Sequence, residues 1–214
     1  EYSNEICDFL NKKNVKLIII ACNTASALAF DFLEKKMIVP IVNVIDPCVE
    51  YATTQTKNKL IGVLGTKATI SSKSYKNKLL KINSNLQISS HSCPLFVPLI
   101  EEGLISHKIT KDICNLYLDK AIFKLIDVLI LGCTHYPLLI DQIKEYIPKD
   151  TTILDSAEIV ALYVKKIFKK NILLTAKKNN KQDQYYLTDK SIQFNKLAAI
   201  FLKESSINIK YIKL

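Results

Sequence analysis

The sequence contains no arginine: all 30 basic residues are lysine, which against 20 acidic residues gives a net charge of +10. A basic surface attracts phosphate, so the charge alone invites a nucleic-acid partner. Arginine, however, is the residue that reads guanine edges and clamps phosphate with two hydrogen bonds. The lysines are also scattered through helical stretches, as at Lys35-Lys36 and Lys165-Lys166. We therefore interpret the charge as a solvated surface and expect no dedicated nucleic-acid face.

Long apolar runs are absent as well. Stretches such as Leu17 to Ala21 and Val128 to Leu131 are much shorter than the ~20 consecutive apolar residues of a membrane span. Residues 1–9 contain neither the basic region nor the apolar core of a signal peptide. We therefore expect a cytoplasmic protein without a membrane partner. Because the chain starts at Glu1 and not at Met, we expect its true N-terminus to lie upstream.

The six cysteines include no CxxC pair and no tight cluster with histidine, so their spacing argues against a zinc site. In a chain without an export signal, free cysteines indicate a reducing compartment. Four of them are expected to be small core residues: Cys7, Cys48, Cys93 and Cys114. The other two, Cys22 and Cys133, occupy positions of a different kind.

Apolar residues make up 49% of the 214 residues, enough for a sizeable core. Apolar, β-branched runs alternate with amphipathic stretches of helical length, which predicts an α/β protein with mostly parallel sheets. The expected strands are 15–21, 41–45, 60–64, 87–93, 128–131, 153–155, 185–188 and 209–212. The expected helices are 25–36, 47–56, 69–81, 110–124, 136–146, 157–170 and 192–203, with loops over 94–98 and 177–184.

Boundaries near Asp46-Pro47 and Asp155-Ser156 divide this pattern into two α/β units. Residues 1–46 and 156–214 form the first unit, and residues 47–155 form a second unit inserted within it. We expect two pseudo-symmetric, Rossmann-like or flavodoxin-like units, of which the first is incomplete at its N-terminus.

An internal similarity marks one position in each unit. An apolar strand leads to a small residue, a cysteine and polar residues, as LIIIACNT at 17–24 and VLILGCTH at 128–135. Ligands in parallel α/β sheets bind at the carboxyl ends of strands, where helix N-termini offer unpaired N–H groups. The positive end of a helix also lowers a cysteine pKa. The sequence therefore predicts activated thiols at Cys22 and Cys133.

Two thiols facing each other across a cleft suit one kind of chemistry. One removes a proton from a carbon atom, while the other, protonated, delivers a proton to the opposite face. The result is inversion of a stereocentre. A single strand-end cysteine would more simply be a core residue, but the paired context favours catalysis.

The segments Ala21 to Ser26 and Gly132 to Leu139 resemble the two signature segments of the glutamate racemase family. Shorter stretches fit as well: Pro40 to Pro47, Gly62 to Thr66, Cys93 to Gly103 and Asp155-Ser156. The resemblance runs over essentially the whole chain. It implies a racemase that interconverts L- and D-glutamate without a cofactor or metal and supplies D-glutamate for peptidoglycan synthesis. Family members are commonly homodimers, so a homodimer is also an expectation.

The resemblance also implies roles for individual residues. Cys22 would act on D-glutamate and Cys133 on L-glutamate, each accepting a proton while the other donates one. The residues that resemble the family's substrate contacts are Asn23, Thr24, Thr134 and His135.

Two further residues are matched to the second thiol. His135 resembles the residue that assists Cys133, and Glu101 resembles the carboxylate beside it. Glu102 competes with Glu101 for that assignment.

The family normally begins with a strand ending in Asp-Ser-Gly and a later Pro-Tyr-Gly turn, and neither occurs before Cys22. We therefore interpret the sequence as a fragment of a longer gene product. Two alternatives to an active glutamate racemase stay open. One is a racemase for another acidic amino acid such as aspartate, against which the segment Gly132 to Leu139 argues. The other is a catalytically incompetent remnant that acts at most as a binding protein.

Overall fold

The computed structural model describes residues 1–170, 183–190, 194, 198, 202 and 208–214. Its strands are β1 (Ile18–Ile20), β2 (Ile41–Asn43), β3 (Leu60–Gly65), β4 (Gln87–Ser92), β5 (Val128–Gly132), β6 (Thr152–Asp155), β7 (Tyr185–Leu187) and β8 (Ile209–Tyr211). Its α-helices are α1 (Tyr2–Asn11), α2 (Asn23–Lys36), α3 (Ile45–Gln55), α4 (Lys67–Ser71), α5 (Ser74–Ile82), α6 (Phe96–Glu101), α7 (Lys108–Leu118), α8 (Ile140–Lys144) and α9 (Ser156–Lys170). Two 3₁₀ helices are η1 (Ala121–Lys124) and η2 (Tyr136–Leu139).

The larger layer is a parallel sheet with the strand order β4-β3-β5-β6. Every residue of the inner strands β3 and β5 is buried, as expected for parallel strands covered on both faces. Gly62 in β3 leaves no room for a side chain, because a Cβ there would lie 2.9 Å from both Ile126 and Leu129. Successive residues of β3 and β5 point into two separate hydrophobic clusters, one on each face.

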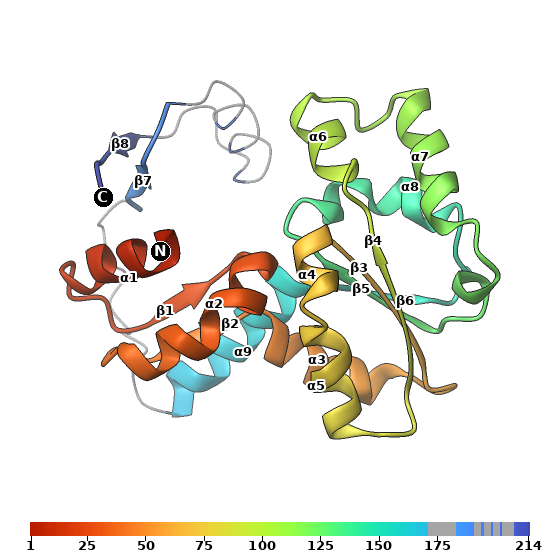
Figure 1. Ribbon diagram of the computed structural model, residues 1–214, viewed down its shortest axis with the longest axis horizontal. Coiled ribbons are helices and arrows are strands. Elements are labelled where there is room, and N and C mark those ends of the chain that lie inside the picture. Colours follow the sequence, from red (N-terminus) through yellow and green to blue (C-terminus); the bar gives the residue numbers. More distant parts are fainter. Residues whose placement is uncertain (171–182, 191–193, 195–197, 199–201, 203–207) are drawn as a thin grey trace.

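Helices cover both faces of this sheet (Figure 1). One cluster joins the sheet to α6, α7 and α8 through Phe96, Cys114 and Ile143. The other joins it to α3 and α5 through Cys48 and Leu79. Because β3 and β5 pair in parallel, their carboxyl ends lie beside each other, at the register pair Gly65 and Gly132.

The smaller layer is the two-stranded parallel sheet of β1 and β2. α1 and α2 pack on it through a cluster that includes Cys7 and Phe30. α9 follows β6 and returns to this layer, where Val160 and Val164 pack with Val42 of β2. The chain thus leaves the smaller layer after β2 and comes back to it after β6.

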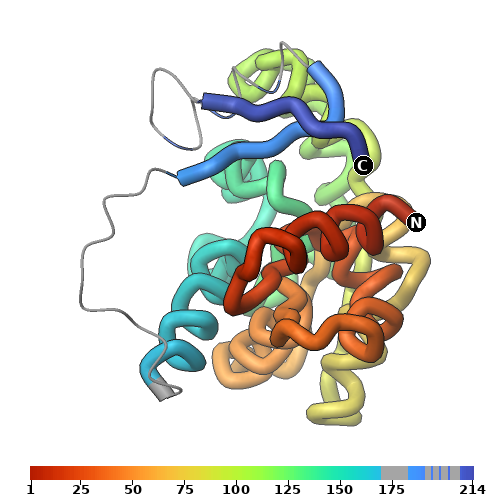
Figure 2. Tube along the Cα trace, turned by 90° about the vertical axis from the view of Figure 1, so that its left-hand side faces the viewer, coloured from red at the N-terminus to blue at the C-terminus, as the bar shows by residue number. Residues whose placement is uncertain are grey.

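The third sheet, formed by β7 and β8, lies beside α1 in both views (Figure 2). The rings of Phe9 in α1 and Tyr186 in β7 meet edge to face, with centroids 5.0 Å apart. Lys13 Nζ stands 5.3 Å from the Tyr186 ring centroid and 5.2 Å from that of Phe9. The N-terminal helix α1 and the strand β7, from the C-terminal part of the chain, are therefore in contact. Within the described residues, no helix is long and apolar enough to cross a membrane.

The α/β class predicted from the sequence is confirmed, and the predicted strands match the observed ones to within a few residues. Several helices differ in detail. The helix expected over 69–81 is two helices, α4 and α5, because Lys73 adopts a left-handed conformation with φ of 57°. The stretches 110–124 and 136–146 each divide into an α-helix and a 3₁₀ helix.

Two elements have no counterpart in the sequence-based expectations. α1 was not predicted, and α6 begins inside the expected loop 94–98. Most of the helix expected over 192–203 and most of the loop expected over 177–184 lie outside the described residues.

Candidate active site

The first predicted thiol, Cys22, stands at the N-cap of α2, two residues beyond the end of β1. Its backbone is extended, and its carbonyl accepts the Ser26 N–H at 2.8 Å, the first hydrogen bond of the helix. The Ser26 hydroxyl donates to the Ile20 carbonyl at 2.9 Å and accepts the Val44 N–H at 3.3 Å. This serine ties the helix start to both strands of the smaller layer, while the Cys22 thiol is exposed.

The second predicted thiol, Cys133, directly follows β5 and is only 6% exposed. Its carbonyl accepts the Tyr136 N–H at 3.2 Å, where η2 begins. Gly132, the residue before it, packs tightly: a Cβ there would lie 2.8 Å from the Leu64 carbonyl oxygen. The thiol is therefore held by a turn that permits no side chain at the preceding position.

Burial raises the pKa of the Cys133 thiol to about 11. The N–H groups of His135 and Tyr136 lower this pKa in part, while negative charge on Cys22 and Glu101 raises it. The expectation of a lowered pKa is thus wrong for Cys133. Burial outweighs the N–H donors, and the helix that follows is a four-residue 3₁₀ helix with little dipole.

The turns that carry the two thiols lie near each other. Tyr75 contacts both, because its hydroxyl donates to Asn23 Oδ1 at 2.6 Å and its ring lies 3.1 Å from where a Cβ of Gly132 would stand. The two cysteines follow strands of different sheets, β1 and β5. The structure therefore brings together the turns that carry both predicted thiols.

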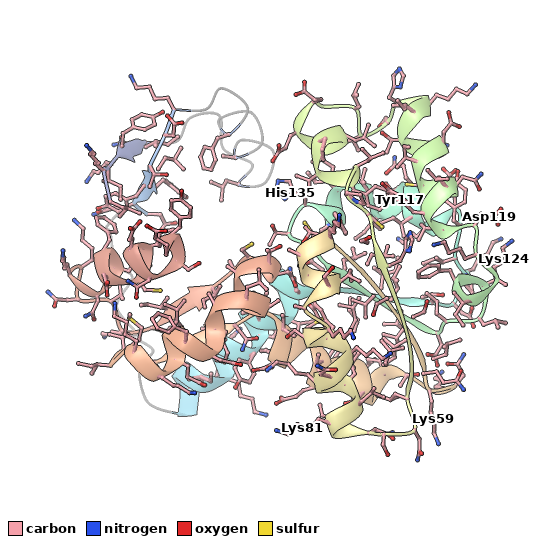
Figure 3. The ribbon with its side chains drawn as sticks, viewed as in Figure 1. Lys59, Lys81, Tyr117, Asp119, Lys124 and His135 are labelled. Atoms are coloured by element: carbon pink, nitrogen blue, oxygen red, sulfur yellow. The ribbon has the colours of Figure 1, made fainter. Side chains whose placement is uncertain are left out.

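His135 stands between Cys133 and Glu101. Its Nδ1 lies 3.9 Å from the Cys133 sulfur, and its Nε2 lies 3.3 Å from a Glu101 carboxylate oxygen. If the thiol donates to Nδ1, the ring proton sits on Nε2 and points at Glu101. Figure 3 shows His135 beside α6, the helix that Glu101 ends. Of the two candidate carboxylates, the contact is made by Glu101 and not by Glu102.

Thr24 belongs to a triangle of hydroxyl groups. Its Oγ1 lies 2.9 Å from that of Thr66 and 3.1 Å from that of Thr69, and these two are 3.0 Å apart. Thr66 is also the N-cap of α4, accepting the Thr69 N–H at 3.2 Å. Neither Thr66 nor Thr69 was among the predicted site residues. Their signal was available, because Gly65-Thr66 ends a buried parallel strand just as the two cysteine segments do.

Asn23 is 1% exposed and uses both ends of its amide inside the protein. Its Oδ1 accepts the Tyr75 hydroxyl at 2.6 Å, and its Nδ2 lies 3.4 Å from the Ser156 hydroxyl. One N–H of Nδ2 is left for another partner. Thr134 is half-buried between Cys133 and His135. All the predicted site residues therefore lie along the starts of α2 and η2 or at the end of α6.

A separate cavity of about 500 Å³ contains none of the predicted site residues. It lies along β6 between α3 and α9, and its lining includes Tyr51, Asp155 and Leu162. Within the described part of the chain, no three His, Cys, Asp or Glu side chains are grouped closely enough to hold a metal ion. The chemistry available at the two strand ends is that of two thiols, an imidazole, a carboxylate and hydroxyl groups.

Known proteins resemble this chain over nearly its whole length. The sequence model of the family described as Asp/Glu/hydantoin racemases matches residues 3–164. The glutamate racemase of Persephonella marina is 46% identical over 196 residues, which cover 92% of this chain and 73% of that protein. The crystal structure of glutamate racemase isoform RacE1 from Bacillus anthracis superposes with a TM-score of 0.93 at 31% identity, covering all of this chain and 79% of that one. Glutamate racemase from Francisella tularensis, solved in complex with D-glutamate, has a TM-score of 0.89 at 33% identity, covering 97% of this chain and 77% of that one.

Two lines of evidence thus agree. The fold is parallel α/β with a thiol after a strand in each layer, and a family model matches most of the sequence. The chain belongs to the Asp/Glu/hydantoin racemase family. Its relatives place it more narrowly, among the glutamate racemases. The predicted family is confirmed, and with it the class of enzyme, an isomerase.

Proposed function

We propose that this chain interconverts L- and D-glutamate by a two-thiol mechanism that uses no cofactor. The observation that carries the proposal is the closeness of two thiol-bearing turns, each after a parallel strand, with Tyr75 touching the neighbours of both Cys22 and Cys133. The names of the relatives support glutamate as the substrate, as does the D-glutamate bound to the Francisella tularensis enzyme.

From D-glutamate, the Cys22 thiolate removes the α-proton and the Cys133 thiol delivers its own proton to the opposite face of the carbon. Cys133 is suited to the donor role, because its pKa of about 11 keeps it protonated at neutral pH. The product is L-glutamate, with Cys22 protonated and Cys133 ionised. Proton exchange with solvent then restores the starting form.

The reverse reaction requires an ionised Cys133. His135 Nδ1, 3.9 Å from the sulfur, is placed to take the thiol proton. The imidazolium that forms would be stabilised by Glu101, 3.3 Å from Nε2. These two residues therefore serve the direction that starts from L-glutamate more than the direction that starts from D-glutamate.

The α-proton of an amino acid is far less acidic than a thiol, so a positioned base alone is not sufficient. Proton transfer by a well-placed group supplies about 10²–10⁴-fold. The remainder must come from donors arranged around the developing negative charge. We assign this binding role to Asn23, Thr24 and Thr134 with the backbone N–H groups at the starts of α2 and η2.

Racemisation assays in both directions test the proposal. D- or L-glutamate is supplied to the purified chain and the opposite enantiomer is measured by chiral chromatography, with aspartate as the comparison substrate. We expect formation of both glutamate enantiomers, little turnover of aspartate, and loss of turnover in Cys22→Ser and Cys133→Ser. Turnover of aspartate in preference to glutamate would reassign the substrate, and undiminished turnover in either variant would reject the mechanism.

We also propose a biological setting and an organisation for the chain. The D-glutamate formed would serve peptidoglycan synthesis in the cytoplasm, and the enzyme would act as a homodimer. The chain would divide into one unit of residues 1–46 and 156–214 and a second unit of residues 47–155. The return of α9 to the β1–β2 layer after β6 supports this division.

A further inference from the structure

Tyr75 is a buried tyrosine of α5 that no part of the proposed mechanism uses. It is 2% exposed, and its hydroxyl donates to Asn23 Oδ1 at 2.6 Å. Asn23 is the residue next to Cys22, at the start of α2 in the smaller layer. The contact therefore joins a helix of the larger layer to the turn that carries the first thiol.

The ring of the same tyrosine lies against the turn that carries the second thiol. A Cβ at Gly132 would stand 3.1 Å from Tyr75 Cε2, closer than side chains normally approach. Gly132 directly precedes Cys133, so its missing side chain lets the ring reach the backbone there. One side chain thus contacts the neighbours of both thiols, through its hydroxyl on one side and its ring on the other.

The hydrogen bonds around the Tyr75 hydroxyl have a fixed direction. The single phenolic proton goes to Asn23 Oδ1, so the amide oxygen of Asn23 is the acceptor. Burial raises the pKa of Tyr75 well above its ordinary value and that of Cys48 to about 12, so both groups stay neutral. With Oδ1 committed to Tyr75, the Asn23 amide presents Nδ2 to Ser156, and its second N–H remains a donor.

We propose that Tyr75 is a positioning residue for racemisation, which fixes the Asn23 amide as a donor toward the substrate and holds the two thiol-bearing turns at a set separation. This inference rests on the proposed function. The hydroxyl acts through Asn23 and does not touch the substrate. Removing it would free the amide to rotate and weaken its hold on both enantiomers equally.

The test is a double-mutant cycle of Tyr75→Phe and Asn23→Leu, with racemisation kinetics in both directions for all four proteins. Tyr75→Phe should lower kcat/KM by about tenfold for D- and L-glutamate alike, mainly through KM. In the Asn23→Leu background, Tyr75→Phe should cause no further loss. Tyr146→Phe is the control, because its hydroxyl donates to the Lys111 carbonyl at 3.0 Å and neither residue belongs to the candidate site. Its kcat/KM should equal that of the parent chain even if its stability falls.

Each outcome of this double-mutant cycle either supports the role of Tyr75 or overturns it. If Tyr75→Phe alone does not fold, Asn23→Leu and the double variant still differ only in the hydroxyl, and the proposal requires equal kcat/KM for these two. A further loss in the double variant would show that the hydroxyl does not act through Asn23. A parent chain that racemises glutamate while Tyr75→Phe matches it would overturn this inference alone. A folded parent chain without racemisation would overturn the proposed function and this inference with it.

Discussion

At the scale of single residues, burial determines the chemistry of the second thiol. Cys133 and its turn are enclosed by Gly132, Tyr136 and the strands beside β5, and the thiol is 6% exposed. A thiol in such surroundings resists ionisation, so its pKa is raised to about 11. In the proposed mechanism, the same enclosure would keep Cys133 a proton donor and would make it depend on His135 when it acts as a base.

The pKa of Cys133 predicts a change of stability with pH. The pKa is raised above the ordinary value of 9.0 to about 11, so the folded protein holds this proton more tightly than the unfolded chain does. The resulting stabilisation is complete below about pH 9 and is lost as the pH rises toward about 11. Urea unfolding at several pH values should show a shallower alkaline loss in Cys133→Ser than in the parent chain. Because the buried Cys93 and Cys48 also have raised pKa values, only the difference between the two proteins is diagnostic. Parallel curves would contradict the assignment.

The two neighbouring glutamates allow a matched comparison. Glu101 lies 3.3 Å from His135 Nε2, whereas its neighbour Glu102 makes no such ion pair among the described residues. Glu101→Gln should lower kcat/KM for L-glutamate by about fivefold, a modest loss because the pair is partly exposed to solvent. The loss for D-glutamate should be smaller, and Glu102→Gln should leave both directions unchanged. Equal effects from the two substitutions would show that Glu101 has no special role in assisting His135.

At the scale of helices and strands, the candidate site is formed by the turns that follow parallel strands. β1, β3 and β5 each end within two residues of a member of the candidate site: Cys22, Thr66 and Cys133. The hydroxyl triangle joins the start of α2 to the start of α4 and thereby links the two layers. The orientation of Thr24 therefore depends on contacts with α4 as well as on its own helix, α2.

Thr66 tests this link. Thr66→Ala removes the N-cap of α4 and should cost about 1 kcal/mol of the free energy of unfolding. It should also raise KM for glutamate, because Thr24 loses one of its two hydroxyl partners. Thr66→Ser keeps the hydroxyl and should restore both quantities. Urea unfolding and steady-state kinetics measure them, and a serine variant as impaired as the alanine variant would refute the hydroxyl's role.

Substitutions at two glycines of the inner strands, Gly132 and Gly62, would test how tightly the turn before Cys133 is packed. A Cβ at Gly132 meets the Leu64 carbonyl oxygen at 2.8 Å, whereas a Cβ at Gly62 meets the ends of flexible side chains at 2.9 Å. Overpacking of this kind costs about 1–3 kcal/mol, and backbone yields less readily than side chains. Gly132→Ala should therefore destabilise the protein more than Gly62→Ala and should lower kcat as well. Thermal unfolding and kinetics of the two variants decide this, and a reversed order would contradict the packing argument.

The sequence was sufficient to predict the elements that repeat a regular pattern. The buried strands and the two strand-cysteine-polar segments follow from local periodicity, and so does the α/β class. The break between α4 and α5 does not, since a lysine gives no sign that it will adopt a positive φ at position 73. The raised pKa of Cys133 also escaped prediction, because it depends on burial by residues distant in sequence. The same holds for the bond between Tyr75 and Asn23, which are 52 residues apart.

At the scale of the whole molecule, the site lies where two layers meet. Cys22 belongs to the smaller layer and Cys133 to the larger one, and α9 and the hydroxyl triangle tie the layers together. A molecule bound between thiols from different layers would present a different face to each of them. This arrangement, more than any single residue, is what suits the chain to inverting a stereocentre.

The most direct test of this account is exchange of the α-proton of D- and L-glutamate in deuterated water, followed by NMR. We predict exchange from both enantiomers with the parent chain and its suppression in Cys22→Ser and in Cys133→Ser. Cys7→Ser, which changes a buried cysteine of α1 in a cluster that includes neither Cys22 nor Cys133, should retain exchange. Exchange that persists in both site variants, or its absence from a folded parent chain, would contradict the claim that two opposed thiols perform the reaction.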